Sequence, residues 1–452
     1  MNYRHKILCF LCFLLGATIQ AQQTWSLDDC VAYAVKHNLQ IKGFEYTEQS
    51  NKESYKQSIR SLLPSVSAFT NYRINFGRSI DPNTNVFVNT EFVSNNYSLD
   101  AQIDLFQGFQ KVNTIKATKF LYKAAFEETL HQKYLLAFRV MSAFYDIQFM
   151  EGLYTISKEQ KEVSQENYDL VKKQVEIGQK AKADLYEAES ALLADQLLVT
   201  QSKNNVEAAK LALIQQMNLE NATTISILTI EDKTSELLEE SESNKDSIFN
   251  KAKNFIPIVK AQELRVEAAK KQLAATRGGL YPSIGFSAGY SSRYVDNNLD
   301  EDTGELIPFN TQIKDNAAQF VGVSLAIPIT NAWASRSRVK QQKVAMMRAE
   351  NDFNVQKQEI YQIIQQLLQD RNALKGEYEQ SEQRAKAQKL AFDIAQKRYE
   401  KGLISIIELN QSKNTLANAQ NEFLQVQLRS KINKSTLDFY RGLPVFNLNR
   451  VQ

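Results

Sequence analysis

Side chains that could carry out chemistry are few in this sequence and do not form a group. The chain has 3 histidines, His5, His37 and His131, and most general acid–base and metal chemistry depends on histidine. The sequence lacks a P-loop, a dinucleotide-binding fingerprint, a nucleophile elbow and paired CxxC motifs. We therefore expect a protein that is not an enzyme and has no catalytic residue, metal site or cofactor.

The densest acidic segment is a possible exception to this expectation. Residues 296–315 contain Asp296, Asp300, Glu301, Asp302, Glu305 and Asp315 against the single basic residue Lys314. A calcium site is conceivable, but the spacing does not fit the EF-hand loop, which needs a glycine at its sixth position. We expect a solvated extracellular loop.

The helices and strands of this chain are predicted to be few and long. Among 452 residues the chain has only 15 Gly and 7 Pro, fewer than the average usage of about 7% and 5% would give. A chain so poor in turn-forming residues can change direction only rarely.

Residues 1–21 are predicted to be a secretory signal peptide. A basic start is followed by the apolar segment Ile7–Ile19, and Ala21 is a plausible last residue before cleavage. A membrane anchor is the alternative, but this apolar segment is too short to span a bilayer as a helix. Cleavage would leave Cys30 as the single cysteine and nearly equal numbers of basic and acidic side chains. No disulfide within the chain and no nucleic-acid partner are then expected.

A repeated pattern organises the rest of the sequence. Residues 62–66, LLPSV, resemble residues 280–284, LYPSI, at an offset of 218. Residues 175–185, VEIGQKAKADL, resemble residues 399–409, YEKGLISIIEL, at an offset of 224. We interpret the chain as two repeats, at residues 22–219 and 249–452, joined by a polar linker at residues 220–248.

Each repeat is predicted to contain a pair of strands in which apolar and polar residues alternate. The pairs cover residues 64–76 and 96–106 in the first repeat, and residues 282–292 and 318–328 in the second. An ordinary half-buried sheet alternates in the same way. The strand lengths also suit tilted strands of an outer-membrane barrel that is apolar outside and polar inside.

Long helices are predicted on both sides of each strand pair. One helix precedes the strands (27–60 and 246–279), a very long helix follows them (108–176 and 332–400), and a shorter helix returns after a glycine turn (183–219 and 406–441). In each repeat the two shorter helices together are about as long as the long one, so they could pair with it end to end. The spacing of Leu409, Ser412 and Leu416 suits tight helix packing.

The number of strands sets a condition on assembly. One chain offers four strands, which cannot close a barrel, and an open sheet edge is not viable in lipid. Two chains would supply eight strands, which leave an interior filled by side chains, and three would supply twelve, which can leave a passage. The sequence alone does not choose between two and three chains.

This order of elements, written twice behind a signal peptide, resembles the TolC-like outer membrane factor family, or outer membrane efflux proteins, over essentially all of the mature chain. The most specific match is residues 398–409, RYEKGLISIIEL, which resemble the family's periplasmic tip. Residues 104–108, DLFQG, resemble the segment in which the strand leads into the long helix, and residues 328–332 fit that segment only loosely.

The resemblance implies a mainly α-helical fold with a membrane β-barrel. A homotrimer would form a 12-strand barrel in the outer membrane, with four strands from each chain, and long antiparallel helical hairpins would form a tunnel in the periplasm. The implied function is the exit duct of a tripartite efflux pump or a type I secretion system. The duct would be passive, opened by a periplasmic adaptor protein and energised by an inner-membrane transporter.

The resemblance also implies roles for residues at the predicted hairpin tips. Family members meet the adaptor at the positions of Gly178, Ala181, Gly402, Leu403 and Ser405. A small residue at a helix end exposes the backbone and leaves room for another helix tip. The two glycines have an alternative interpretation as ordinary helix caps.

A periplasmic gate is implied beside these tips. Asp184 and Glu408 match acidic positions near the family's periplasmic mouth, and Tyr399 matches a tyrosine that helps to hold the mouth closed. Three copies of a carboxylate around an axis would favour cations, although the helix dipole alone also favours an acid in a first turn. Ile404 stands in place of a basic gating residue and Gln411 in place of a second acid, so we expect a less polar gate.

A periplasmic coiled-coil scaffold or adhesin without a pore is the alternative function. It would explain the helices but not the four strands with strict alternation. Extraction behaviour separates the two, because a duct needs detergent whereas a scaffold is soluble in salt.

Overall fold

The computed structural model describes residues 24–80, 85–89, 91–220, 222–228, 244–300 and 302–446. The predicted signal peptide, much of the predicted linker and residues 447–452 lie outside these ranges. The chain divides into two compact units. A helical unit comprises Met1–Tyr46, Glu127–Lys260 and Gln356–Gln452, and a sheet-bearing unit comprises Thr47–Phe126 and Ala261–Val355.

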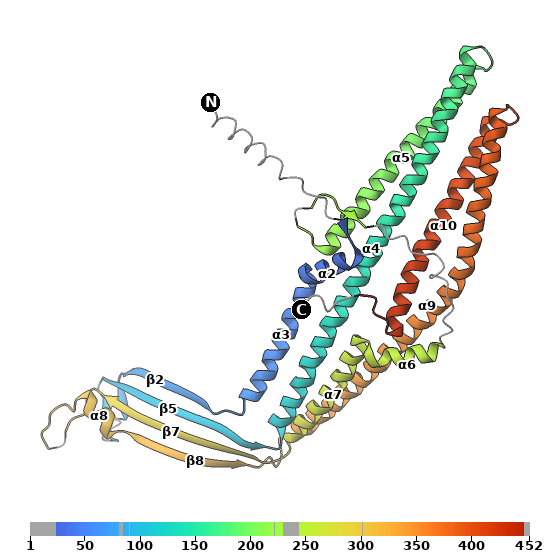
Figure 1. The fold of residues 1–452 in the computed structure, drawn as a ribbon. Coiled ribbons are helices and arrows are strands. Elements are labelled where there is room, and N and C mark those ends of the chain that lie inside the picture. The colour runs from blue at the N-terminus through green and yellow to red at the C-terminus, as the bar shows by residue number, and fades with distance from the viewer. Residues whose placement is uncertain are drawn as a thin grey trace, which may run out of the picture. The chain divides into compact units, whose positions relative to one another are not determined.

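Two helical hairpins account for most of the described residues (Figure 1). In the first, α4 (Gln110–Glu176) is followed by α5 (Lys182–Met217), and in the second, α9 (Ala334–Glu400) is followed by α10 (Ile406–Arg441). Both long helices have 67 residues and both return helices have 36, so each long helix measures about 100 Å. Among the described residues, no helix combines the length and the apolar character needed to cross a membrane.

The helices ahead of the strands are each divided in two, so the prediction of single helices at residues 27–60 and 246–279 was wrong. The first region contains α2 (Leu27–His37) and α3 (Leu39–Arg60), and the second contains α6 (Lys245–Phe255) and α7 (Pro257–Gly278). In both regions the two helices have 11 and 22 residues.

Each of these breaks has a local cause. The Oδ1 atom of Asn38 accepts hydrogen bonds from the backbone N–H groups of Gln40 and Ile41 at 2.9 and 3.3 Å, which caps the start of α3. Ile256 is extended, with ψ of 120°, because a residue before proline avoids the helical region, whereas Pro257 suits the first position of α7. The second break was therefore visible in the sequence as Pro257.

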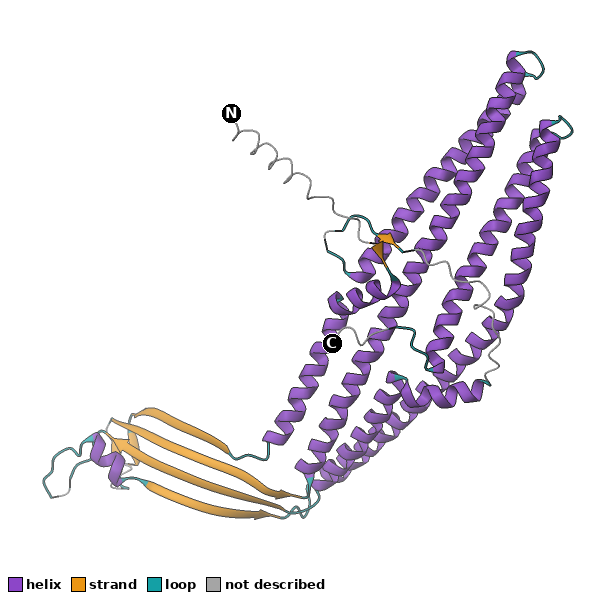
Figure 2. Cartoon of the chain, in the orientation of Figure 1, coloured by secondary structure: helices purple, strands orange, loops and turns teal. Residues whose placement is uncertain are grey.

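Four antiparallel strands form one sheet in the order β2, β5, β7, β8 (Figure 2). They are β2 (Ser65–Asn75), β5 (Phe92–Gln107), β7 (Ser283–Val295) and β8 (Ala318–Ala326). β5 starts before the predicted residue 96 and β7 continues past residue 292, because backbone pairing extends through the polar residues there. β8 ends ahead of Pro328, which cannot donate to a ladder.

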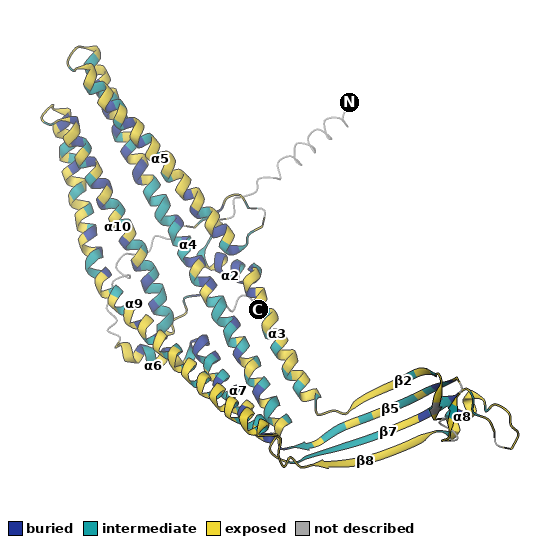
Figure 3. Cartoon of the chain, turned by 180° about the vertical axis from the view of Figure 1, so that it is seen from behind, coloured by how far each residue is buried: buried dark blue, intermediate teal, exposed yellow. Residues whose placement is uncertain are grey.

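The strand register gives the sheet one apolar face and one polar face. One row across the four strands consists of Val66, Ala101, Ala288 and Val321, and the adjacent row on the other face consists of Ser65, Gln102, Ser287 and Gly322. On the single chain the apolar face is open, since Val321 is 73% and Leu325 is 62% exposed. Figure 3 shows the edge strands β2 and β8 as largely exposed. An apolar surface of this kind marks contact with a membrane or another protein.

The helical unit has a hydrophobic core of its own. α2, α4 and α5 supply most of its buried side chains, among them Leu136, Phe144 and Leu213. Cys30 is fully buried in this core, and burial raises the pKa of its thiol to about 12, so the reactive thiolate is not formed near neutral pH. A short parallel pair, β1 (Thr24–Trp25) with β6 (Ser226–Ile227), belongs to the same unit.

The sheet-bearing unit also contains a second, two-stranded sheet and a short helix. β3 (Arg78–Ile80) pairs with β4 (Phe87–Asn89), and α8 (Phe309–Asp315) is fixed to β7 by Gln312. The buried amide of Gln312 accepts from the Val295 N–H at 3.0 Å and donates to the Val295 carbonyl at 2.9 Å. Within the described residues, including the acidic segment apart from Glu301, no group of His, Cys, Asp or Glu side chains is placed to hold a metal ion.

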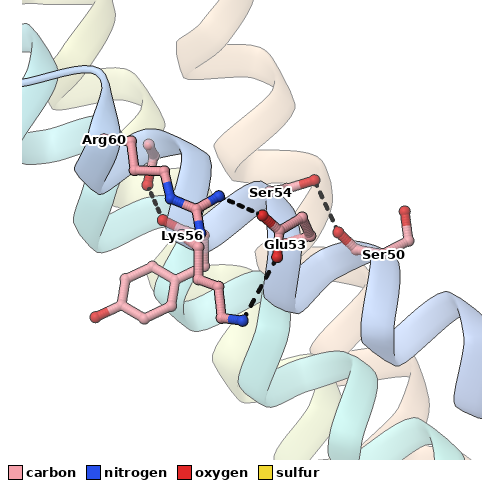
Figure 4. Close-up of polar contacts among 7 residues, drawn as sticks. Ser50, Glu53, Ser54, Lys56 and Arg60 are labelled. Carbon is pink, nitrogen blue, oxygen red and sulfur yellow. Dashed lines mark hydrogen bonds and ion pairs between the residues drawn. The ribbon is translucent and has the colours of Figure 1, made fainter. Parts of the chain in front are cut away.

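Ion pairs lie on the surface of α3, as the close-up in Figure 4 shows. Arg60 donates to Glu53 at 2.5 Å, and Lys56 lies 3.5 Å from the other oxygen of the same carboxylate. The Arg60 guanidinium holds the pKa of Glu53 below its usual value. Because these side chains are about half exposed, the ion pairs add little to stability.

Both long helices begin after two consecutive residues in the left-handed region. Gly108 and Phe109 have φ of 57° and 62°, and Ala332 and Trp333, at the same repeat offset of 224, have φ of 51° and 66°. The sequence match between these two segments was loose because residues 104–108, DLFQG, and residues 328–332, PITNA, differ at every position, and Ala332 stands in place of Gly108. A Cβ atom at Gly108 would overlap the Gly278 carbonyl oxygen and would lie 2.9 Å from Tyr281 Cβ. The contacts of Gly108 therefore require a glycine, and its left-handed conformation adds strain for any other residue.

We expect Gly108→Ala to destabilise the sheet-bearing unit by roughly 1–3 kcal/mol, because the methyl group would meet the Gly278 backbone and the residue would stay at positive φ. The measurement is the thermal unfolding midpoint of the detergent-purified protein. Gly376→Ala is the control, since Gly376 lies inside α9 with open space around it, and its midpoint should stay equal or rise. Equal midpoints for the two variants would contradict the prediction.

Candidate functional site

Each of the two hairpins ends in a short turn (Figure 1), and the two turns have the same backbone conformation. Gly178 follows α4 with φ of 77°, and Gly402 follows α9 with φ of 72°. The N–H of Gln179 donates to the Gln174 carbonyl at 2.8 Å, and the N–H of Leu403 donates to the Arg398 carbonyl at 2.9 Å. This is the Schellman pattern, in which a left-handed glycine closes the helix. Both glycines therefore act as helix caps.

The second tip leads into α10 through a complete capping box. The Glu408 N–H donates to Ser405 Oγ at 3.2 Å, and the Glu408 carboxylate accepts from the Ser405 N–H at 2.8 Å and from its hydroxyl at 3.0 Å. These bonds pair two backbone groups that a helix start would otherwise leave open. The backbone hydrogen bond from Ser405 is the main reason why the pKa of Glu408 is lowered.

The first tip has only half of this arrangement. Ala181 stands where the second tip has Ser405, so its side chain offers no hydroxyl to cap α5. The Asp184 carboxylate still turns back and accepts from the Ala181 N–H at 3.1 Å. Both acids of the predicted gate therefore bind their own helix starts, as the helix dipole favours.

Tyr399 joins the two tips of one chain. Its side chain is only 5% exposed and packs with Val171, Ala188 and other side chains from both hairpins. Lys180, in the first tip, donates to the Tyr399 hydroxyl at 3.3 Å, and its ammonium group lies 5.0 Å from the centre of the same ring. The same lysine thus makes a hydrogen bond and a cation–π contact.

A cleft of about 370 Å³ lies between the two tips. Asp184, Tyr399, Gly402, Ile404 and Ser405 all line it, so the structure brings together half of the predicted tip and gate residues. The other predicted residues, Gly178, Ala181, Leu403, Glu408 and Gln411, lie on the exposed surface and do not line the cleft.

A buried polar cluster connects the hairpins further from the tips. Lys413 of α10 donates to Asp195 of α5 and, at 2.7 Å, to Ser164 Oγ of α4. The Ser164 hydroxyl donates to Asp195 Oδ2 at 2.5 Å. The side chains of Lys413 and Asp195 are 5% and 10% exposed, so this ion pair is shielded from water.

The sequence prediction missed this cluster. It placed Leu409, Ser412 and Leu416 on the packing face of the return helix, whereas Lys413 is buried and Ser412 only partly so. The available signal was a lysine four residues after Leu409 and three before Leu416, which is the spacing of one helix face. Only the folded chain shows that Asp195 neutralises it.

Long antiparallel hairpins with exposed glycine turns, on a chain that also forms a sheet with one apolar and one polar face, indicate a protein that combines a membrane sheet with long helices outside it. The sequence profile of the family described as "Outer membrane efflux protein" matches residues 32–219 and 249–443. The chain therefore belongs to the outer membrane efflux protein family, which confirms the predicted family. Membership also confirms an outer-membrane location and a channel rather than an enzyme.

Individual relatives agree with this assignment. The outer membrane efflux protein BepC of Brucella suis biovar 1 (strain 1330) is 21% identical over 327 residues, which are 72% of this chain and 65% of BepC. The match thus spans just under two thirds of that relative. The Campylobacter jejuni CmeC outer membrane channel superposes with a TM-score of 0.79 at 15% identity, covering 93% of this chain and 86% of CmeC. For the outer membrane protein VceC of Vibrio cholerae the TM-score is 0.74 at 14% identity, with 92% and 96% covered. These structures confirm the predicted fold class.

We expect Lys413→Met to lower the stability of the helical unit by about 3–5 kcal/mol, because the Asp195 carboxylate would stay buried without its cation. The measurement is the thermal unfolding midpoint of the detergent-purified protein. The control is Lys413→Met combined with Asp195→Leu, which removes both charges at similar volume and should recover most of the loss. A single variant as stable as the wild type would show that the ion pair is not needed.

We expect Ser405→Ala to loosen the first turn of α10 by about 1 kcal/mol, since the helix loses its cap. Amide hydrogen exchange of residues 406–409 should become faster. Ala181→Ser is the reciprocal control, because it supplies the missing hydroxyl and should slow exchange in the first turn of α5. Unchanged exchange in Ser405→Ala would contradict this role of the capping box.

The same contact should depend on pH. The folded-state pKa of Glu408 is lowered from its ordinary value of 4.5. The stabilisation is therefore complete above that ordinary value and is lost as the pH falls through the lower folded-state pKa. Protection of this turn, corrected for intrinsic exchange chemistry, should fall in that acid range in the wild type and stay level in Glu408→Gln.

Proposed function

We propose that three copies of this chain form the outer-membrane exit duct of a tripartite efflux pump or a type I secretion system. The observation that carries the proposal is the four-stranded sheet with one apolar face, one polar face and outer edges on β2 and β8. In lipid each backbone N–H and C=O group must find a partner, so these edges have to pair with other copies. Twelve strands from three copies would enclose a passage, whereas eight strands would be filled by side chains.

Exposed apolar stripes on the hairpins support packing between copies of the chain. On α5, Tyr186, Leu193 and Leu197 are 65%, 57% and 58% exposed, and on α9, Leu390 and Ile394 are 65% and 59% exposed. Spacings of seven and four residues are those of helices that pack side by side. The two stripes lie at similar distances from their tips, so α5 of one copy could pack on α9 of the next. Six hairpins would then form the periplasmic tunnel.

The hairpin tips are proposed to bind a periplasmic adaptor protein. Gly178 and Gly402 have no atom within 4 Å of the position that a Cβ atom would take, and the neighbouring Leu403 is 65% exposed. Such a turn leaves its backbone accessible to the tip of another helical hairpin. Ala181 and Ser405, at the following helix starts, would complete the contact.

The periplasmic gate is proposed at the cleft between the tips. The Lys180–Tyr399 contact and the apolar packing of Ile404 would keep the tips of one chain together. In a trimer, Asp184 and Glu408 would each form a ring of three carboxylates at the mouth, which favours cations. Gln411 adds no charge to that mouth.

The proposed duct is passive and has two repeats in each chain. The sequence has no phosphate-binding motif, so the driving force would come from an inner-membrane transporter that the adaptor joins to the duct. Repeats at residues 22–219 and 249–452, joined at residues 220–248, would each supply one hairpin and one strand pair, the latter in contact with the lipid bilayer.

Planar-bilayer conductance of the detergent-purified protein, together with its mass, tests the proposal. We expect discrete current steps from a trimer-sized particle. Asp184→Ala with Glu408→Ala should reduce the preference for cations, measured as the reversal potential in a salt gradient, because both carboxylate rings are lost. The matched control is Asp169→Ala with Glu379→Ala, which removes two exposed carboxylates outside the tips and should leave that potential unchanged.

Two further outcomes are informative. An intact trimer without current would indicate a closed mouth, and Lys180→Ala with Tyr399→Phe should then produce current, since the contact between the tips is lost. A species that is soluble in salt, does not trimerise and does not insert into bilayers would contradict the duct. That result would favour the coiled-coil scaffold or adhesin.

A further inference from the structure

The polar face of the four-stranded sheet carries two exposed aromatic exceptions. Serine, asparagine, glutamine and glycine make up most of this face, but Phe69 of β2 and Phe320 of β8 also lie on it. Their side chains are 61% and 53% exposed. A ring that lies over a glycine on a neighbouring strand can serve only to stabilise the sheet. The residues around the rings therefore show whether the rings could also bind a ligand.

Phe320 lies in the same cross-strand row as an aspartate. Ser67, Asp100, Gly289 and Phe320 lie opposite one another across β2, β5, β7 and β8. A Cβ atom placed on Gly289 would overlap the Phe320 ring and would lie 3.0 Å from Asp100 Oδ1. The ring edge and the carboxylate therefore meet above Gly289. Phe69 lies opposite Ser98, one residue pair along the same face, within reach of Asp100 from the other side.

The charge of Asp100 is not paired with a cation within the described chain. Its Oδ2 atom accepts a hydrogen bond from Ser98 Oγ at 2.9 Å, and no ion pair of the described residues includes it. The neighbouring Asp104, by contrast, lies 3.0 Å from Lys111 Nζ. Arg293 shares a row with Asn96, four residues from Asp100 along β5, which is about 14 Å.

We propose that Asp100, Gly289 and Phe320 form a binding subsite for organic cations on the inner wall of the duct. The proposal rests on the duct for its position inside a passage, but the three residues belong to one chain. The ligands of this subsite would be cations with an apolar or aromatic body, such as quaternary ammonium compounds.

The chemistry of the subsite selects this class over metal ions. An aromatic ring attracts weakly hydrated cations, and a carboxylate adds a full negative charge beside it. A divalent metal ion needs six or more oxygen ligands or a rigid octahedral shell, whereas Asp100 and the Ser98 hydroxyl supply few. Three copies would place three carboxylates and six rings around the passage. A cation could then move between several weak sites and leave.

Block of the channel current by benzyltriethylammonium tests the subsite, with uncharged benzyl alcohol as the comparison compound. Wild-type current should fall with increasing concentration of the cation but not of the alcohol. Asp100→Asn and Phe320→Leu should each raise the half-blocking concentration roughly three- to tenfold. Gly289→Ala should act in the same direction without a change of charge, because its methyl group displaces the Phe320 ring.

Matched controls separate the subsite from general effects. Asp104→Asn removes a carboxylate on the same face, and Phe286→Leu removes a ring on the opposite face; neither should change the block. If the protein does not conduct, titration calorimetry of the same cation against the detergent-solubilised protein replaces the current and should show the same order of variants. Failure to trimerise and to insert into bilayers would count against the duct alone. Equal block or binding by the wild type, Asp100→Asn and Phe320→Leu would overturn the subsite.

Discussion

Backbone hydrogen bonding at the two edges of one small sheet sets the conditions that the other exposed surfaces of this chain must meet. β2 and β8 each have a single neighbour within the four-stranded sheet, yet the family places the chain in a membrane, where an unpaired edge is costly. A chain on its own is therefore incomplete. The open apolar face of the sheet and the exposed leucines of α5 and α9 have the same explanation, since each surface is a contact that other copies or lipid would cover.

The helices would continue the wall of the proposed duct, and their lengths allow them to pair without gaps. In each half of the chain, helices of 11, 22 and 36 residues together roughly match one helix of 67 residues. Apolar packing alone would let such long helices slide past each other by a turn. The buried Lys413–Asp195 pair opposes sliding, because its charges are satisfied in one register only. The two halves of the chain contribute differently to this pair, since Asp195 comes from the first half and Lys413 from the second.

The tips combine stability with accessibility. Their glycines close the long helices and also leave the space around the turns empty, and Asp184 and Glu408 cap the return helices while they remain near the surface. One tip has a hydroxyl at the helix start and the other has an alanine, so only the tip with Ser405 has a complete capping box. Lys180 and Tyr399 connect the tips directly, together with the apolar side chains packed around Tyr399.

The order of the strands and long helices, and several of their ends, could be predicted from the sequence. Pro64 and Pro328 limit the strands, Gly178 and Gly402 end the long helices, and alternation gave the two faces of the sheet, because each of these features acts through local backbone geometry. The break at Asn38 was not visible, since asparagine occurs in many contexts. The left-handed conformation of Ala332 and Trp333 was not predicted either, because residues of these types rarely adopt it. The contacts between distant segments could be seen only in the folded chain. Lys413 meets Asp195, Lys180 meets Tyr399, and Phe320 meets Asp100 above Gly289, because such pairs depend on packing and strand register, which no local pattern encodes.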